Sequence, residues 1–578
     1  MKIGRLWRTI RYLGPSQITH RVRLRARRAV MARFPALARR RTEARASKLA
    51  MPDINSPAMA DIAGIVLTHQ NAVHGAHLDG IENASFVLHN QEFAFGAIEE
   101  IDWRGGFREG DNPLRRMTLA YMGYLPPVLA RGRAQDLALA GRIVKSFDDG
   151  NRWAAPGVLG DSWHPYAASH RLINLLSGLA LYRKANGPTD AEVEDRILRH
   201  ARLCAAHIES NLERDVQFNH LMKNLVALSV YGGELVAGIR QSVAQCVLAD
   251  GGHAERSPMY HLLALLDVRM LGVLGMDSAI VTKMEAALRV MTHPDGEIAL
   301  FNDSWFGEAP PPSEGVPPAE TATLEITGYT QLRRGGDAVI FDHGSCGPNG
   351  NAAHAHADFL SVEVSAGGRR LIVDPGVATY TAGEMRHATR SAASHNGPHV
   401  AGEDTLEHWG SFRVGRRAQA GALTDAAPAG FAPLHCAGRH DGYRSRGIMA
   451  RRFVGLWPGE GALLCDLWLG GAGAPATSTF LVPATWRIAG GNPLTLENDG
   501  VSVRVETPAG ILADMELGQH WPRFEAPEPA HKITLIPDPV GPDLRAALWL
   551  SWNNSAIAPD GDTLARLFDA LAGAKGGS

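Results

Sequence analysis

Apolar residues recur every three or four positions between residues 113 and 295. This spacing places them on one face of a helix and predicts a series of amphipathic α-helices. The predicted helices occupy residues 114–132, 136–149, 171–185, 192–212, 220–235, 238–249, 259–271 and 278–291. They follow one another in pairs with short connections and without intervening strands, which favours an α/α toroid of antiparallel helices.

After residue 320 the apolar residues alternate with polar ones, and glycine or asparagine separates the alternating runs. This pattern predicts β-strands. The clearest runs occupy residues 323–335, 337–344, 359–368, 369–376, 462–471, 478–488, 501–508 and 547–554, and a short helix is predicted over 561–573. Many strands joined by short turns favour a large antiparallel β-sandwich.

A chain of 578 residues is too long for a single core. We therefore predict a multidomain α+β protein. A basic arm over 1–50 precedes an α/α toroid domain over 51–307, a proline-rich linker over 308–320 and an antiparallel β-sandwich domain over 321–578. Within the toroid domain, residues 51–110 show a mixed pattern that predicts short strands or turns.

Charge is distributed unevenly along the chain. Residues 1–50 hold fifteen Lys or Arg and one acid, Glu43, for a net charge of +14, whereas the whole chain has −2 and the remainder −16. The net charge thus gives no support for a nucleic-acid partner. The arm predicts one or two basic amphipathic helices, either packed on the body through residues such as Leu6 and Trp7 or attracted to anionic lipid or a polyanionic substrate.

The sequence contains no run of eighteen apolar residues, so no transmembrane segment is predicted. The first residues lack the apolar stretch and cleavage site of a signal peptide, and the residues alone therefore predict a cytoplasmic location. Five scattered cysteines without metal-binding spacing are interpreted as free thiols.

Residues with metal-binding and proton-transfer chemistry gather between 354 and 396. His354, His356 and Asp358 alternate, so on an extended strand they share one face. Asp374 ends the next apolar run, and His395 follows after a loop. Imidazole and carboxylate together form a ligand set that zinc accepts.

This cluster has three interpretations. A zinc hydrolase of the metallo-β-lactamase type would use His354, His356 and Asp358 directly, although Phe359 stands where that motif needs histidine. Alternatively, the groups are buried and satisfy one another, which is costly for so many ionisable side chains.

The third interpretation divides the roles. A structural zinc is bound by His356, Asp374 and His395, while His354 is held near the cleft between the domains. Asp358 then supports the zinc ligands or pairs with an arginine such as Arg386 or Arg390.

The predicted helices supply polar and aromatic groups near their starts. Asn219 and His220 begin one helix with Lys223 one turn later, and Tyr260 follows the helix-start signal Pro258. Trp163 and Tyr166 precede another helix, and this combination suits a sugar-binding cleft.

The motifs in both halves resemble the heparinase II/III superfamily of polysaccharide lyases, which is related to heparan-sulfate, alginate and oligoalginate lyases. They are NH at 219–220, ERSPMYH at 255–261, HAHAD at 354–358, LIVDPG at 371–376, SHN at 394–396 and WGSFRVGRRA at 409–418. The resemblance implies an α/α toroid followed by a β-sandwich, in agreement with the periodicity.

The resemblance also implies β-elimination on an acidic polysaccharide that contains uronic acid. By this similarity Asn219 and His220 neutralise the substrate carboxylate, Tyr260 is the acid and also a base on one face of the sugar, and His354 is the base or a charge stabiliser on the other. To act as a phenolate, Tyr260 would need its pKa lowered by His220, His354 or Lys223.

By the same resemblance, His356, Asp374 and His395 hold structural Zn²⁺ without touching the sugar. Arg386, Arg390 and Arg413 are candidates for binding substrate carboxylates or sulfates, or else for structural ion pairs. The family implies the periplasm or cell envelope, in conflict with the location expected from the residues alone. A third functional class is a non-catalytic glycan-binding protein of the envelope.

Overall fold

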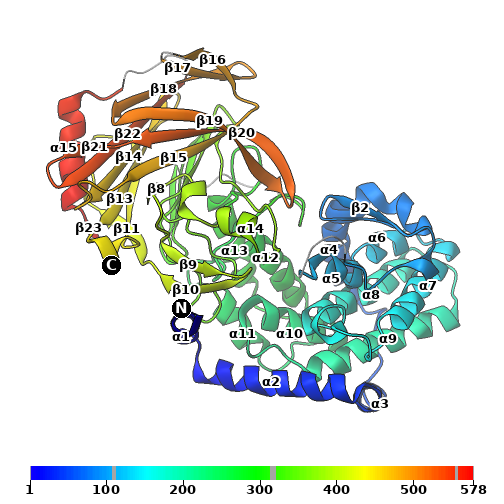
Figure 1. The fold of residues 1–578 in the computed structure, drawn as a ribbon. Coiled ribbons are helices and arrows are strands. Elements are labelled where there is room, and N and C mark those ends of the chain that lie inside the picture. Colours follow the sequence, from blue (N-terminus) through cyan, green and yellow to red (C-terminus); the bar gives the residue numbers. More distant parts are fainter. Residues whose placement is uncertain (1, 107–111, 313–319, 492, 553–557, 577–578) are drawn as a thin grey trace.

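The computed structural model describes residues 2–106, 112–312, 320–491, 493–552 and 558–576. A helical first half is followed by a second half of antiparallel sheets (Figure 1). The predicted linker 308–320 is described only in part, because residues 313–319 lie outside these ranges. The end of the last predicted strand, residues 553–554, also lies outside them.

The basic arm forms helices α1 (Lys2–Ile10), α2 (Pro15–Arg33) and α3 (Pro35–Ala46), one more than the sequence pattern predicted. Pro15 and Pro35 stand at the first helical position, where the missing N–H costs nothing. Helix α1 packs on strand β10 (Arg413–Arg417) and α3 packs on α9, so the arm reaches from the sheets to the helical half (Figure 1).

The helical domain contains helices that pack on their sequence neighbours, as in the pairs α8–α9 and α12–α13. Their bounds are α4 (Pro57–His74), α5 (Leu114–Tyr121), α6 (Leu125–Leu129), α7 (Ala134–Gly150), α8 (Pro165–Lys184), α9 (Ala191–Ser210), α10 (Phe218–Gly232), α11 (Ile239–Cys246), α12 (Pro258–Val273) and α13 (Ser278–Val290). Within the described ranges, none of these helices is both long and apolar enough to cross a bilayer.

Helix α4 corrects the expectation of strands or turns over residues 51–110. Its N-cap Ser56 accepts a hydrogen bond from the backbone of Met59 at 3.2 Å, and Pro57 occupies the first turn. This Ser-Pro start signal outweighs the mixed pattern that follows. The same region does contain a short hairpin, β1 (Ser85–Leu88) and β2 (Gln91–Ala94).

The second half consists mainly of three sheets in the described ranges. A five-stranded sheet contains β3 (Thr321–Leu324), β4 (Tyr329–Arg334), β5 (Asp337–Asp342), β6 (Val362–Ala366) and β7 (Arg369–Ile372). A four-stranded sheet has the order β19 (Ile511–Arg523), β20 (Ala526–Ile536), β15 (Ala476–Pro483) and β8 (Pro398–Val400).

The largest sheet has ten strands. They are β16 (Arg487–Gly491), β17 (Leu494–Asn498), β18 (Val501–Ala509), β22 (Asp543–Trp552), β14 (Gly461–Leu469), β13 (Met449–Trp457), β12 (Leu434–His440), β11 (Ala420–Thr424) and β23 (Lys575–Gly576) in order, with β21 (Asp538–Val540) on β22. A two-stranded ribbon of β9 (Leu406–Trp409) and β10 lies beside the sheets.

The three sheets share one apolar core, to which Phe341 of β5, Trp468 of β14 and Phe480 of β15 all contribute. Helix α15 (Gly561–Gly573), as predicted, packs Leu567 and Phe568 in a second cluster with residues of β13 and β14 (Figure 1). The predicted fold class, an α/α toroid followed by an antiparallel β-sandwich, is thus confirmed.

Side chains from the sheet half enter the core of the helical half. Val377, Tyr380 and Phe524 belong to the same buried cluster as the toroid helices. Gly376, which precedes them, has φ +69° and a substituent Cβ would lie 2.2 Å from the carbonyl oxygen of Trp521. Glycine is therefore required where the chain leaves β7 toward the junction of the two halves.

Candidate active site at the junction of the two halves

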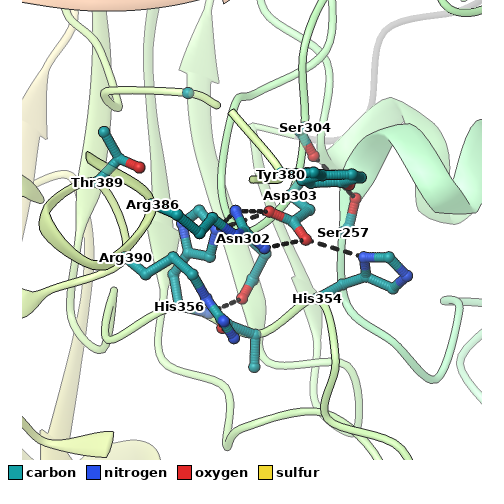
Figure 2. Close-up of polar contacts among 12 residues, drawn as sticks. Ser257, Asn302, Asp303, Ser304, His354, His356, Tyr380, Arg386, Thr389 and Arg390 are labelled. Carbon is teal, nitrogen blue, oxygen red and sulfur yellow. Dashed lines mark hydrogen bonds and ion pairs between the residues drawn. The ribbon is translucent and has the colours of Figure 1, made fainter. Parts of the chain in front are cut away.

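One buried carboxylate, Asp303, organises the histidines of the 354–358 motif (Figure 2). His354 donates through Nδ1 to its Oδ2 at 2.9 Å, and His356 donates through Nε2 to its Oδ1 at 2.9 Å. Arg386 donates to both oxygens, at 2.6 and 2.8 Å. Burial opposes ionisation of Asp303, but Arg386 and the two histidines outweigh it and hold the pKa of Asp303 well below its usual value.

The neighbouring Asn302 fixes this loop against the motif. Its backbone N–H donates to Asp358 Oδ2 at 2.9 Å, and its side-chain oxygen accepts from the backbone of His356 at 3.0 Å. The pKa of Asp358 is raised to about 6, because burial and the nearby Asp374 together outweigh the opposing effect of His395. Asp358 thus supports the motif strand, as one of the sequence interpretations expected.

Left-handed backbone conformations border the segments that carry these groups. Asn302 precedes Asp303 with φ +58°, Phe218 precedes Asn219 with φ +45°, and Arg256 stands before Tyr260 with φ +58°. Non-glycine residues adopt this region at a cost, and such strain concentrates at functional sites. Each of the three segments therefore contains a non-glycine residue with a positive φ angle.

The phenol ring of Tyr260 lies on the imidazole ring of His354, with centroids 3.9 Å apart. Tyr260 belongs to the first turn of α12, where Ser257 caps the helix by accepting from the Tyr260 N–H at 3.2 Å. The hydroxyl group of Tyr380 lies 3.3 Å from that of Tyr260. Two tyrosines and a histidine from both halves of the chain therefore meet at one point.

The surroundings of Tyr260 raise its pKa instead of lowering it. Burial is the largest cause, and Tyr380, Asp303 and Glu255 add to it, so the pKa of Tyr260 lies well above its usual value. Lys223 does not compensate, because its amino group is bound to Asp267 at 2.5 Å. The expectation that cations lower the pKa of Tyr260 is therefore wrong in this structure, which holds Tyr260 as a neutral phenol.

The ion pair with Asp267 also removes Lys223 from the expected substrate contacts. Both side chains are almost fully buried. Separating such a pair to bind a sugar would leave the carboxylate of Asp267 buried without its partner. Lys223 is thus a structural residue here.

A second charged group lies at the start of α10. His220 Nδ1 is 2.8 Å from Oε1 of the fully buried Glu213, and His164 Nε2 lies 3.5 Å from the same oxygen. Burial opposes both charges, but their mutual attraction prevails: the pKa of Glu213 falls to about 2 and the pKa of His220 is raised. The ion pair therefore favours the protonated, positively charged form of His220.

Tyr166 and Asn219 flank His220. The ring centroid of Tyr166 lies 4.5 Å from that of His220. The side-chain oxygen of Asn219 is buried without a hydrogen-bond partner. Glu255 links the two charged groups, since it lies 3.6 Å from His354 Nε2 and interacts electrostatically with His220.

A cavity of about 90 Å³ opens beside these residues, with Tyr166, Tyr260 and Tyr380 in its wall. Glu308 also lines it, and burial raises the pKa of this carboxyl group to about 7. The first residue of the predicted linker therefore belongs to the cavity wall. A titratable carboxyl group in a cavity lined by tyrosines is typical of a functional site.

Two of the predicted zinc ligands present free nitrogen atoms. Because Asp303 binds the Nε2–H of His356 and Asp374 binds the Nδ1–H of His395 at 2.8 Å, the opposite ring nitrogens are lone-pair donors. Both of these nitrogens are buried without a partner, and the rings lie 5.3 Å apart. Burial lowers the pKa of each histidine, so both are neutral. This donor set fits zinc.

Two other groups are more compact. In the described ranges, two groups of three residues bring one potential ligand atom from each residue within 4.8 Å of the other two. These groups are His164–Glu213–His220 and His387–Asp404–His408. The ligand atoms of the predicted triad His356–Asp374–His395 do not lie this close together. Asp374 is engaged with His395 and stands behind it in the way that carboxylates orient zinc-bound histidines.

Three other predicted substrate contacts are buried and bound to groups of the protein itself. Trp163 is fully buried, and its indole N–H donates to the carbonyl of Asn151. Arg386 is held by Asp303, and Arg390 is fully buried and donates to backbone carbonyls including that of Ala355. These three residues support the core and the motif loop.

Arg413 lies apart from the cavity. It is exposed on β10, where its guanidinium stacks on Trp409 at 4.4 Å. This side chain is therefore not among the groups that the fold brings to the junction.

The sequence interpretation missed several groups at the site. Asp303, Glu213, Tyr380 and Glu308 were not singled out, and Glu255 was quoted only as part of a motif. The one available signal was the polar Asn-Asp-Ser run at 302–304, directly after an apolar stretch. The partners of the Asp303 carboxylate lie more than fifty positions away, so no local pattern could pair them.

Comparison with known proteins agrees with this organisation. Residues 316–546 match the family described as Heparinase II/III-like, C-terminal. A crystal structure of heparinase III aligns over 88% of this chain and 87% of that chain with TM-score 0.64 and 15% identity. A mutant of heparan sulfate lyase HepC from Pedobacter heparinus aligns over 90% and 88%, with TM-score 0.54 and 15% identity.

No curated protein sequence is similar enough to match. At 15% identity the two structural likenesses establish the fold. The family match covers the segment with the motifs at 354–358, 371–376 and 394–396. This region therefore resembles the Heparinase II/III-like C-terminal family, and the two-part fold is shared with the solved heparinase III and HepC structures.

Proposed function

We propose that this protein is a polysaccharide lyase that cleaves a uronic-acid-containing glycan by β-elimination. The contact of Tyr260 with His354 across the two halves, beside a cavity and His220, is the observation that carries the proposal. Acidic polysaccharides of this kind place the protein in the periplasm or cell envelope.

The first requirement of the reaction is neutralisation of the substrate carboxylate. The C5 proton is weakly acidic, and its removal places charge on the adjacent carboxylate. His220, whose protonated form is favoured by Glu213, and the side-chain N–H group of Asn219 would bind that carboxylate. Their place at the start of α10 adds the positive end of the helix dipole.

The second requirement is a pair of proton-transfer groups. His354 donates its Nδ1–H to Asp303, so its Nε2 lone pair can accept the C5 proton. Tyr260, as a neutral phenol, would donate its proton to the leaving glycosidic oxygen. The C4–O bond breaks as the C4–C5 double bond forms, and no water is consumed. Each group contributes about 10²–10⁴-fold to the rate.

The zinc ion has a structural role in this proposal. His356 and His395, with Asp374, would hold it and thereby fix the motif strand and the loop that leads to residue 395. A zinc hydrolase that uses His354, His356 and Asp358 directly has less support, because Asp358 accepts a hydrogen bond from the backbone of Asn302 and the free Nε2 of His354 faces Glu255 at 3.6 Å.

The experiment is a screen of the purified protein against alginate, heparan-type chains and unsulfated uronic-acid polysaccharides. A lyase generates new reducing ends together with the ultraviolet absorbance of an unsaturated uronate. New reducing ends without that absorbance would establish a hydrolase. Binding measured by calorimetry without either product would establish a non-catalytic glycan-binding protein.

A further inference from the structure

The basic arm exposes more large apolar side chains per residue than the rest of the described chain. Sixteen large hydrophobic residues in the described ranges are exposed, and seven of them lie within the first 37 residues. They are Leu6, Trp7, Ile18, Val22, Val30, Phe34 and Leu37, with Trp7 68% and Val22 65% exposed. Exposed apolar side chains gathered in one segment mark an interaction surface.

These exposed side chains do not belong to the face by which α2 packs on the protein, because α2 buries a different face. Leu24 and Met31 are buried there, and Arg27 donates to Asn211 at 2.9 Å. Ile18, Val22 and Val30 are separated by four and eight positions and therefore share the opposite face. Helix α2 is thus apolar on the side that points away from the protein.

The inner contacts also fix the arm in place. Arg8 donates to Glu407 of β9 at 2.5 and 2.7 Å, and Arg45 donates to Glu209 of α9 at 3.0 Å. One end of the arm is therefore tied to the sheet half and the other to the helical half (Figure 1). The outer face is presented on a fixed scaffold.

Unpaired arginines accompany the outer apolar face. Arg23, Arg25, Arg33, Arg40 and Arg41 are exposed. Within the described residues, none of the five forms an ion pair. Such a face complements a surface whose outer layer is anionic and whose layer underneath is apolar, because the arginines can pair with the anions and the apolar side chains can be buried below them.

The joint between α2 and α3 forms a hollow of the same character. Its volume is about 380 Å³. Val30, Phe34 and Leu37 line it together with Arg41 and Arg45. The guanidinium groups of this hollow could bind an anionic lipid headgroup, and its apolar walls could contact the first carbons of the acyl chains.

We propose that the outer face of α2 and α3 docks on the surface of a bilayer that contains anionic lipid. A polysaccharide would engage the arginines but would leave Val22, Val30 and Phe34 in water, whereas a bilayer buries them. The docking does not depend on the proposed lyase reaction, because the arm contributes no residue to the cavity beside Tyr260.

The test is sedimentation of the full chain with vesicles of phosphatidylcholine, or of phosphatidylcholine mixed with phosphatidylglycerol. The wild type is expected to bind the mixed vesicles and not the neutral ones, and added salt is expected to weaken binding. A Val22→Ser, Val30→Ser, Phe34→Ser variant is expected to bind at least about tenfold more weakly. Absence of wild-type binding to the mixed vesicles overturns the proposal.

Two further variants test whether vesicle binding requires the arginines and whether it is specific to this apolar face. Arg23→Gln, Arg25→Gln, Arg41→Gln is expected to weaken vesicle binding on the order of a hundredfold, since each basic residue near an anionic surface is worth roughly fivefold. The matched apolar control is Ile511→Ser, Leu517→Ser on β19, which are 63% and 81% exposed and should leave binding unchanged. Circular dichroism verifies that every variant is folded.

Two results would show a different occupant. If the serine variant binds vesicles like the wild type while the glutamine variant loses both vesicles and an acidic polysaccharide, the surface is a polysaccharide site and the proposal is wrong. If the wild type is a dimer in sedimentation velocity without vesicles and the serine variant is a monomer, the face joins two copies of the chain, and the proposal is also wrong.

Discussion

The phenol of Tyr260, in the first turn of a toroid helix, lies against the imidazole of His354, which belongs to the sheet half, with ring centroids 3.9 Å apart. The orientation of each of these two side chains also depends on a residue outside the helix or loop that carries it. Ser257 caps the helix that carries Tyr260, and Asp303 orients the ring of His354. The candidate chemistry therefore depends on the junction between the halves.

The first prediction concerns the proton-transfer pair. Tyr260→Phe removes the proton donor and keeps the ring contact, so we expect turnover to fall by about 10²–10⁴-fold with little change in substrate affinity. His354→Ala should cause a loss of similar size. Unsaturated-product absorbance gives the rate and calorimetry gives the affinity. Full turnover in both variants would falsify the site assignment.

The second prediction concerns the buried carboxylate. Asp303→Asn leaves Arg386 buried without its anion, and we expect a loss of about 3–5 kcal/mol in the free energy of unfolding, measured in urea. The control is Asp569→Asn, an exposed partner of Arg545, which should change the free energy of unfolding by less than about 1 kcal/mol. Equal effects in the two variants would contradict the central role of Asp303.

The third prediction concerns pH. Because Glu213 raises the pKa of His220, the charge on His220 is present at low pH and is lost as the pH rises through that raised pKa. In Glu213→Gln the pKa of His220 should fall, so KM should begin to rise at a lower pH than in the wild type. A KM profile that does not move would show that His220 does not bind the substrate as a cation.

The same pair predicts a change in acid stability. The pKa of Glu213 is depressed to about 2, so its stabilisation is present above the unfolded pKa near 4.5 and is lost as the pH falls toward 2. The fully buried group contributes roughly 3 kcal/mol at neutral pH. Glu213→Gln should therefore show a weaker dependence of the urea midpoint on pH between about 5 and 2. An unchanged dependence argues against the ion pair.

The fourth prediction concerns the metal. The protein should purify with about one zinc per chain. His395→Ala should lose that zinc, because it removes the buried Nε2 that has no partner and is one of the proposed zinc ligands. His387→Ala, an exposed member of the neighbouring His387–Asp404–His408 group, is the control and should retain it. Elemental analysis decides between them, and zinc that disappears only in His387→Ala would place the metal in the other group.

The fifth prediction separates Trp163 from Tyr166. Trp163→Ala should cost about 3–5 kcal/mol of stability, since the side chain is fully buried. Tyr166→Phe keeps the ring that lines the cavity and should be nearly as stable as the wild type. Thermal unfolding measures both. A stable Trp163→Ala variant with a raised KM would restore Trp163 as a substrate contact and oppose its assignment to the core.

By itself, the sequence determined the elements and most of the chemistry-bearing residues. Three- and four-residue spacing predicted the toroid helices, alternation predicted the sheets, and the motifs marked Tyr260, His220, His354 and the two histidines that we propose as zinc ligands. Local patterns suffice for these because helix faces, strand faces and helix starts repeat at fixed short intervals.

Only the tertiary structure decided which groups act together and in which charge state. Asp303 holds two histidines and Arg386, Glu213 holds His220, and Tyr380 reaches Tyr260 from the other half. Burial and ion pairing also turned Lys223, Arg386 and Arg390 into structural residues. Sequence spacing carries no information on these pairings, because desolvation and electrostatic partners arise when distant segments pack into one low-dielectric junction.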